Sequence, residues 1–444
     1  MQHPYPVAYC LMFMLFSCAP DAAPSSSALQ PVVEAAAPTL DNPSGSRTQR
    51  ALAGNVKIAV MGPLTGPASG YGQSQLNGVR LAAEEINAKQ GEGRLHVELV
   101  VVDDEGNMSA SGDRLVKLVY EDKVNAIIGA INSSVTHVVE MVCAKTRVPM
   151  ITTTSTDPSI TRTGTYWAFR CLADDLLQGQ ALAHRIFEVD GHKNVFILMQ
   201  NNRYGKMGGR EIARIATESG HPPLAVRVFD GKAAHWPDEV RGIATANPDA
   251  IVLWGLYNPC GRLISELRQG GIEAPVYGAD GMVHPAFLEQ AGLAAEGAIV
   301  TLPFDPCRNH PTTRHFLEKY LHRFGEPPDS FAAHSYDAMM IIWEAIQRGK
   351  CTDRTCIKDN MLLTHQHDGV TGFITLDKEG NDTRSVDLAQ VIAGKLVPLS
   401  LFQGRSVVDI RREIRETLES PGTPPDGDHR SSGWVYCPAP LDNP

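Results

Sequence analysis

Two segments carry hydroxyl groups in an arrangement that suits a carboxylate ligand. Ser133 and Ser134 open a predicted helix, where side-chain hydroxyls and free backbone N–H groups favour an anion. The run Thr152–Thr156 places five hydroxylated residues after a predicted strand, and Ser155 and Thr156 are the candidate ligand residues within it. Each feature also has an ordinary structural interpretation. One of the serines could be no more than the N-cap of the helix, and the threonine-rich run could be a solvated turn.

Asp280 offers the opposite charge, and three tyrosines offer apolar contact. Asp280 ends a predicted strand between glycines, where it could pair with an ammonium group or only stabilise its own turn. Tyr71, Tyr204 and Tyr257 lie in segments predicted to be loops after strands. Their rings could stack on a ligand and their hydroxyls could hydrogen-bond to it, although each could also be an ordinary packing residue.

The motifs of the common enzyme classes are absent from the 444-residue sequence. It contains no G-x-S-x-G, H-E-x-x-H, Walker A, G-x-G-x-x-G or C-x-x-C pattern, and its 15 histidines lack the spacing of metal ligands. We therefore predict a protein that binds a small molecule and catalyses nothing, with neither a cofactor nor a metal ion. The net charge of −10 and the lack of a basic stripe exclude nucleic acid as a partner.

Apolar strands alternate with amphipathic helices and position the candidate segments. Strands are predicted at 56–61, 95–102, 126–131 and 149–152, with helices at 75–88, 110–121 and 134–145. The alternation restarts with strands at 195–200, 224–229, 250–255, 276–278 and 298–302 and helices at 208–218, 238–246 and 262–269. Helices at 313–324, 332–347 and 408–418 and a final strand at 372–376 follow. Repeated β-α-β units form parallel sheets covered by helices, and ligands bind beyond the carboxyl ends of their strands.

The N-terminus resembles a bacterial lipoprotein signal. A short apolar run, Val7–Phe16, leads into Leu15-Phe16-Ser17-Cys18, and we predict a signal peptide at 1–18 with a lipid on Cys18. The alternative is a cleaved secretory signal with an incidental cysteine. Residues 19–54, rich in Ala, Pro and Ser, are expected to form a disordered tether. The protein is thus predicted to be exported to the periplasm or cell surface and held to a membrane by the lipid, without a spanning helix.

Seven cysteines lie outside the signal region, so at least one is unpaired or pairs with another chain. Cys351 and Cys356 are close in sequence and could pair. The connectivity of the others stays open at this point.

Taken together, these segments resemble the branched-chain amino-acid-binding family of periplasmic proteins, which serve ABC transporters. The similarity covers about residues 55–397 and is specific because many short motifs recur in the family's order and spacing. These motifs are Val56–Gly66, Asn77–Ala82, Glu85–Ala88, Asp103-Asp104, Gly129–Ser134, Pro149–Pro158, Tyr204-Gly205, Ala279–Gly281 and Glu296-Gly297.

The resemblance implies an α/β, type I periplasmic binding fold. Two Rossmann-like lobes with parallel sheets would be joined by three hinge crossings near residues 172, 304 and 370. The implied N-terminal lobe is 55–172 and 305–370, and the implied C-terminal lobe is 173–304 and 371–399. Residues 400–444 are an additional tail with no counterpart in the family.

The resemblance also implies roles for particular residues. A serine at the position of Ser133 and the loop matching Ser155-Thr156 hold the α-carboxylate of an amino acid, and an acidic residue matching Asp280 takes its ammonium group. Many members have glutamate there, so Asp280 would reach less far. Aromatic residues matching Tyr71, Tyr204 and Tyr257 line the cleft. Asn132 stands where members have a disulfide cysteine.

The implied function is that of an extracytoplasmic receptor, which captures an amino acid or close analogue between the lobes and delivers it to an ABC transporter permease. The alternative is the ligand-binding module of a sensory or regulatory system, such as an amide or amino-acid sensor. Both functions predict that the two lobes close on the ligand through small changes at the hinge.

Overall fold

The structure is a computed structural model that describes residues 52–66, 68–91, 93–402, 405–419 and 434–437. The predicted signal peptide, Cys18 and most of the predicted tether lie outside these ranges. Within the described ranges, no helix combines the length and the apolar character needed to cross a membrane.

The first sheet is parallel, with strand order β2-β1-β3-β4-β5. Along β1, Val56, Ile58 and Val60 contribute to one hydrophobic core, whereas Ala59 and Met61 contribute to the core on the opposite face. This alternation explains the continuous apolar run, because both faces of the sheet are covered. The strands are β1 (Gly54–Gly62), β2 (Leu95–Asp103), β3 (Ala126–Gly129), β4 (Met150–Thr152) and β5 (Ala168–Arg170).

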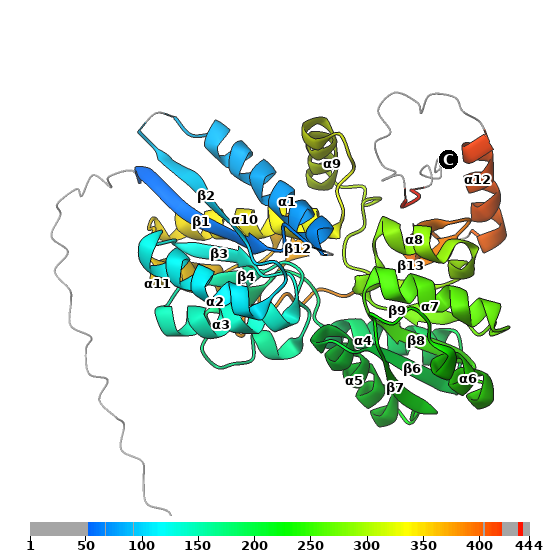
Figure 1. Ribbon diagram of the computed structural model, residues 1–444. Helices are drawn as coiled ribbons and strands as arrows, with labels where there is room; N and C mark the ends of the chain where they lie inside the picture. The colour runs from blue at the N-terminus through cyan, green and yellow to red at the C-terminus, as the bar shows by residue number, and fades with distance from the viewer. Residues whose placement is uncertain (1–51, 67, 92, 403–404, 420–433, 438–444) are drawn as a thin grey trace, which may run out of the picture. The chain divides into compact units, whose positions relative to one another are not determined.

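Helices cover both faces of this sheet (Figure 1). One face carries α1 (Ser69–Ala88), α9 (Pro311–Phe324), α10 (Ser330–Gly349) and α11 (Arg354–Met361), and the other carries α2 (Met108–Val116), the π-helical turn η1 (Lys117–Glu121) and α3 (Ser133–Thr146). Helices α1 and α10 pack so closely that a Cβ atom on Gly78 would lie 2.0 Å from the Ala332 carbonyl oxygen. These elements, together with the hairpin of β11 (His367–Gly369) and β12 (Gly372–Ile374), are called the first lobe.

The second sheet has the order β14-β13-β10-β9-β8-β6-β7. Its strands are β6 (Val195–Gln200), β7 (Ala225–Phe229), β8 (Ala250–Trp254), β9 (Val276–Gly278), β10 (Ile299–Leu302), β13 (Asp387–Ile392) and β14 (Lys395–Pro398). One face carries α4 (Asp175–Ala183), η3 (His184–Val189) and α5 (Arg203–Glu218), and the other carries α6 (Pro237–Ala246), α7 (Tyr257–Gln269), α8 (Pro285–Ala291) and η5 (Gly292–Ala295) (Figure 1). These elements are called the second lobe.

The expectation of an all-parallel second sheet is wrong, because β13 pairs antiparallel with β10 and β14 pairs antiparallel with β13. The two strands form a hairpin whose turn residues, Ala393 and Gly394, both have positive φ angles. A tight hairpin of this kind can only join antiparallel strands. The strand predicted at 372–376 is therefore not the last strand of the chain.

The third passage between the lobes lies later than residue 370. Ile374 and Leu376 belong to the core of the first lobe, and Asn381 forms a bridge with Arg170 at the end of β5. The chain joins the second sheet only at Asp387. The other passages, between β5 and α4 and between β10 and α9, lie close to the expected residues 172 and 304.

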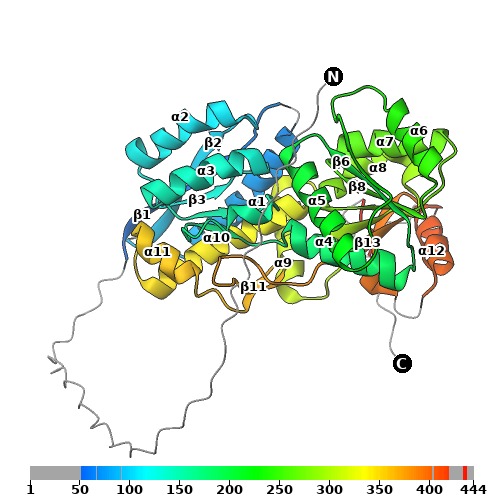
Figure 2. The ribbon, with the colours of Figure 1, turned by 90° about the horizontal axis from the view of Figure 1, so that it is seen from below.

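Part of the predicted C-terminal tail packs on the second sheet (Figure 2). After η6 (Leu399–Phe402), α12 (Val407–Glu419) buries Ile410 and Ile414 against Ile392 and Val397. Val435 then pairs with Leu396 of β14, and Cys437 forms a disulfide with Cys307. The sequence alone left this pairing open, because the two cysteines are 130 residues apart.

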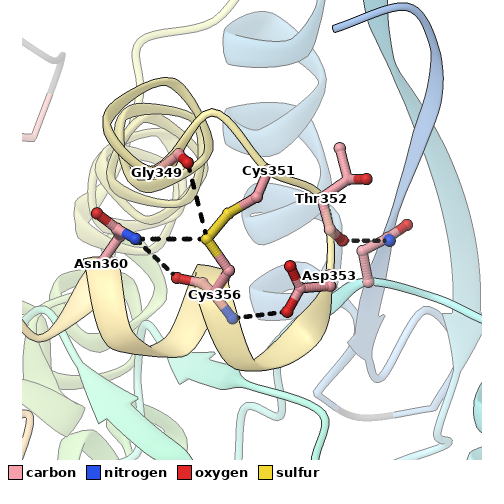
Figure 3. Close-up of a disulfide and its surroundings, with 7 residues drawn as sticks. Gly349, Cys351, Thr352, Asp353, Cys356 and Asn360 are labelled. Carbon is pink, nitrogen blue, oxygen red and sulfur yellow. Dashed lines mark hydrogen bonds between the residues drawn. A yellow bond between two sulfur atoms is a disulfide. The ribbon is translucent and has the colours of Figure 1, made fainter. Parts of the chain in front are cut away.

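The pairing of Cys351 with Cys356, one of the possibilities read from the sequence, is present (Figure 3). It joins Cys351, which follows α10, to Cys356 in the first turn of α11, and Asp353 caps α11 by accepting a hydrogen bond from the Cys356 N–H at 2.9 Å. Cys143, Cys171 and Cys260 are unpaired and buried. Among the described residues, Cys351, Asp353 and Cys356 are the one group of clustered metal-ligand types, but the disulfide occupies both sulfurs.

Candidate ligand-binding site

The carboxyl ends of the two sheets meet through aromatic contacts. Tyr71 of the first lobe has its ring 5.2 Å from the ring of Tyr257 and 5.6 Å from that of His284, both in the second lobe. Tyr257 and His284 stack at 4.2 Å, and Phe331 of α10 lies 4.3 Å from Tyr71. His284 and Phe331 were not recognised in the sequence, because a lone aromatic residue carries no local signal of a site.

The three tyrosines do not lie in loops, as predicted, but in the first turns of α1, α5 and α7. These helices begin five or six residues before the predicted starts at 75, 208 and 262. Their first turns are rich in glycine and polar residues, so apolar periodicity does not detect them. The start of α5 is fixed by Asn202, whose side chain accepts a hydrogen bond from the Gly205 N–H at 2.6 Å.

Ser133 begins α3 but does not cap it. The cap is Asn132, which accepts a hydrogen bond from the Val135 N–H at 2.9 Å and donates one to the Gly106 carbonyl at 3.2 Å. Ser133 is buried, and its hydroxyl makes no hydrogen bond to any other described residue. Ser134 points elsewhere, into a groove that it shares with Arg203. The capping interpretation therefore fails for both serines, and only Ser133 is both buried and uncommitted.

The hydroxyl-rich loop after β4 contains one uncommitted side chain as well. Ser155 donates to the Ile131 carbonyl at 2.8 Å and lies 2.5 Å from the Thr136 hydroxyl, so its side chain holds the loop together. The Thr156 hydroxyl is buried without a hydrogen-bond partner among the described residues. Arg170, a buried residue that sequence reasoning missed, supports the loop by donating to the Ser155 carbonyl at 3.2 Å.

Asp280 begins a short 3-10 helix, η4 (Asp280–Met282), directly beyond β9. Its Oδ1 accepts a hydrogen bond from the Tyr204 hydroxyl at 2.7 Å, and its N–H donates to Gln178 at 3.1 Å. Burial raises the pKa of Asp280 to about 6. Hydrogen bonds from Tyr204, Gln178 and the Gly281 N–H oppose this rise in the pKa and hold the carboxyl in place.

A second carboxyl, that of Asp175, lies close to Asp280 and was not recognised in the sequence. Asp175 is the first residue of α4, is fully buried, and has both side-chain oxygens unpartnered among the described residues. Burial raises its pKa well above the usual range, the Thr156 hydroxyl opposes this, and Asp280 raises the pKa further. The acidic pair Asp174-Asp175 was a possible signal, but it lies beside residue 172, where a hinge crossing was expected.

Buried polar groups from both lobes thus lack partners around one position. They are the hydroxyls of Tyr71 and Thr156 and the carboxyl of Asp175, and Asp280 lies close enough to raise the pKa of both Tyr71 and Asp175. An unpaired buried polar group costs about 1–3 kcal/mol, so a small polar molecule that satisfies several of them gains that free energy on binding. The arrangement suits the capture of a ligand with both a hydrogen-bonding and a cationic end.

Residues 55–395 match the family model described as periplasmic binding protein. The chain belongs to the periplasmic binding protein family. The described C-terminal residues, 399–402, 405–419 and 434–437, lie beyond the matched residues.

Individual members of the periplasmic binding protein family are similar over most of the chain. The leucine-, isoleucine-, valine-, threonine- and alanine-binding protein of Pseudomonas aeruginosa is 27% identical over 74% of this chain and 87% of its own length. The crystal structure of a leucine-binding protein from Thermotoga maritima is 28% identical, with a TM-score of 0.73, over 77% of this chain and 97% of that one. A branched-chain amino-acid-binding protein from Streptococcus pneumoniae, solved with isoleucine, is 26% identical, with a TM-score of 0.71, over 77% and 98%.

These similarities confirm the resemblance seen in the sequence and the type I periplasmic binding fold, with one parallel and one mixed sheet. They also confirm that the protein belongs to a class of binding proteins rather than enzymes. The individual site residues stay predictions. In the structure, Tyr71, Thr156, Tyr204, Tyr257 and Asp280 lie close together, and Ser133 lies at the same sheet edge. The Ser155 hydroxyl is used in hydrogen bonds within its own lobe, and Ser134 lines a different groove.

Proposed function

We propose that this periplasmic binding protein captures an amino acid or a close analogue between its lobes and delivers it to an ABC transporter permease. The observation that carries the proposal is the pair of carboxyls, Asp175 and Asp280, facing the uncommitted Thr156 hydroxyl. An α-amino acid has adjacent opposite charges, and a selective site must satisfy both when it removes their water. The names of the similar proteins from three bacteria, all binders of branched-chain amino acids, support the same ligand class.

Each group has a role in the proposed complex. Ser133 and Thr156 hold the ligand carboxylate beside the N-terminus of α3, and the Asp280 carboxylate holds the ammonium group. The tyrosines at 71, 204 and 257 surround the remainder of the ligand. Since the carboxylate side belongs to the first lobe and the ammonium side to the second, binding of both ends favours the closed arrangement.

A thermal-shift screen against the common amino acids and small amides tests the ligand class. A ligand that binds only the folded state raises its stability in proportion to saturation. We expect branched-chain amino acids to raise the melting temperature and scattering profiles to show a more compact protein when the ligand is bound. Uptake of the ligand by cells that lack and then regain the protein separates transport from sensing, since a sensor alters a response without carrying the ligand inward.

The lipid anchor on Cys18 is part of the proposal. A Cys18→Ser variant should be processed differently and should leave the membrane fraction. Unchanged export, processing and fractionation would instead mean that the N-terminus is an ordinary secretory signal.

A further inference from the structure

One charged side chain joins the two lobes outside the ligand-binding position. Arg203, the first residue of α5 in the second lobe, reaches residues of the first lobe. Its Nε lies 2.6 Å from Asp157 Oδ2, and its Nη2 lies 2.7 Å from His137 Nε2 and 3.2 Å from the Ser159 hydroxyl. These three contacts fix the orientation of the guanidinium and place its positive charge beside the Asp157 carboxylate.

Asp157, the main partner of Arg203, is a buried carboxylate that stays ionised. Burial acts to raise its pKa, but the contact with the His137 ring, the hydrogen bonds from Ser159 and the charge of Arg203 hold that pKa well below its usual range. The Asp157 side chain is fully buried, whereas that of Arg203 is partly exposed. Loss of the arginine therefore removes the one lysine or arginine charge paired with this carboxylate among the described residues.

The pair is coupled to the ligand loop. Asp157 directly follows Thr156, the residue with the uncommitted hydroxyl. The Asp157 carbonyl accepts a hydrogen bond from Arg170 at 2.8 Å, so the backbone is held from the first lobe while the side chain is held from the second. Among the contacts of the Asp157 side chain, separation of the lobes would break only those with Arg203, since His137 and Ser159 belong to the first lobe.

We propose that Arg203 is a positioning residue that latches the closed cleft by pairing with Asp157 on the loop that holds the ligand. The inference rests on the proposed function, in that the latch acts when the lobes close on a ligand. Arg203 lies across from the ligand loop and stabilises the closed form without contacting the ligand. Because the Arg203 contacts form only when the lobes close, the latch tightens binding by stabilising the closed complex relative to the open one.

The latch predicts a particular kinetic signature. Ligand escape requires the lobes to part, whereas entry uses the open form, in which the Arg203 contacts are already absent. Removing the latch should therefore speed dissociation and leave association nearly unchanged, as is usual for contacts formed after encounter. A residue that only supports the fold would lower the melting temperature instead.

The experiment uses the full chain, L-leucine as probe and three variants. Arg203→Gln removes the charge, and Arg203→Lys keeps the charge without the planar fork. Arg210→Gln is the matched control, because Arg210 lies on the same helix and lines the same groove but makes no hydrogen bond or ion pair with the described residues of the first lobe. Stopped-flow fluorescence gives both rate constants, and small-angle scattering without ligand gives the radius of gyration.

We expect Arg203→Gln to dissociate about tenfold faster, with association changed less than about threefold. Arg203→Lys should fall between it and the wild type, and Arg210→Gln should match the wild type. The unliganded Arg203→Gln protein should have a larger radius of gyration than the control. A melting temperature within the range of the control shows that the fold is retained.

Two results separate this inference from the proposed function. If Arg203→Gln binds leucine with wild-type rates and has the radius of the control, the latch is overturned while the proposed function stands. If the wild type binds no amino acid but Arg203→Gln alone is expanded, the ligand class is overturned while the latch stands.

Discussion

The two walls of the candidate site differ in how their polar groups are used. On the first lobe, Ser155 and Thr152 use their hydroxyls within the loop, the latter by donating to the Ala130 carbonyl at 3.1 Å, and the hydroxyls of Tyr71, Ser133 and Thr156 remain without partners among the described residues. On the second lobe, the Tyr204 hydroxyl orients the Asp280 carboxylate by donating to it at 2.7 Å, and both oxygens of Asp175 lack partners among the described residues. Both walls carry aromatic rings, but the polar groups of the first wall are neutral and those of the second include two carboxyls.

This difference predicts which wall contributes more to the affinity for an amino acid. A hydrogen bond from a neutral hydroxyl contributes about 0.5–1.5 kcal/mol to binding. Removing one partner of a desolvated charge pair costs more free energy than that. We therefore expect the second wall to determine whether a ligand with an amino group binds, and the first wall to adjust how well its carboxylate is held.

The largest expected effect comes from Asp280. Asp280→Ala and Asp280→Asn should each weaken the binding of an α-amino acid at least about thirtyfold, because removing one partner of a desolvated charge pair costs about 2–5 kcal/mol. Calorimetry measures the loss, and circular dichroism verifies the fold. Near wild-type affinity in both variants would show that Asp280 does not bind an ammonium group. The ligand would then lack an amino group, as an amide or a carboxylic acid does.

The pH dependence of binding should come from the second wall alone. With the pKa of Asp280 near 6, binding of an ammonium group should weaken roughly tenfold between pH 7 and pH 5, because the carboxyl must first release a proton. Affinities measured by calorimetry across this range test it. In Asp280→Asn the pH dependence should disappear, and a wild-type affinity that does not change with pH would contradict the assignment.

The same pKa has an opposite effect on the unliganded protein. Folded Asp280 keeps its proton up to about pH 6, whereas the unfolded chain releases it near its usual value of 3.8. The folded state binds more protons in this window, so the contribution of Asp280 to the free energy of unfolding falls as the pH rises from about 4 to 6. The melting temperature gained on adding ligand should accordingly be larger at pH 7 than at pH 5.

Within the first wall, Thr156 and Ser155 should separate binding from stability. Thr156→Val should weaken ligand binding about five- to tenfold, because the variant keeps the shape but loses the uncommitted hydroxyl. Ser155→Ala should instead lower the free energy of unfolding by about 1 kcal/mol, because it removes an internal hydrogen bond. Calorimetry and urea unfolding of both variants distinguish the two roles, and a reversed pattern would show that they were exchanged.

The smallest expected effect is that of Ser133. Ser133→Ala should weaken binding about two- to fivefold, since the helix N-terminus and its backbone N–H groups remain for the carboxylate. Asn132, not Ser133, caps α3, so the melting temperature should stay within about 2 °C of the wild type. A large loss of stability would mean that Ser133 supports the fold. Thr156 would then be the remaining candidate among these two residues to bind the ligand carboxylate.

Local patterns were enough to predict most of the elements. The strands at 195–200 and 276–278 have the predicted bounds, because each is an apolar run ended by a turn signal. The starts of α1, α5 and α7 were predicted too late, because glycine and polar side chains in a first turn do not repeat with helical period. Helix α4 was missed because it follows β5 directly and was interpreted as a crossing.

The sequence by itself determined the alternation of strands and helices, the sheet edge at which the polar segments lie, and the acidic and hydroxylated character of the site, since each is a property of neighbouring residues. Two features of the site come from tertiary contacts: the Thr156 hydroxyl, unlike that of Ser155, has no hydrogen-bond partner among the described residues, and Asp175 lies close to Asp280. The ion pair of Arg203 with Asp157 and the disulfide of Cys437 with Cys307 also join residues that are far apart in the sequence. These features depend on contacts between residues distant in the chain. No local periodicity records such contacts, because they form only when the packed elements bring the side chains together.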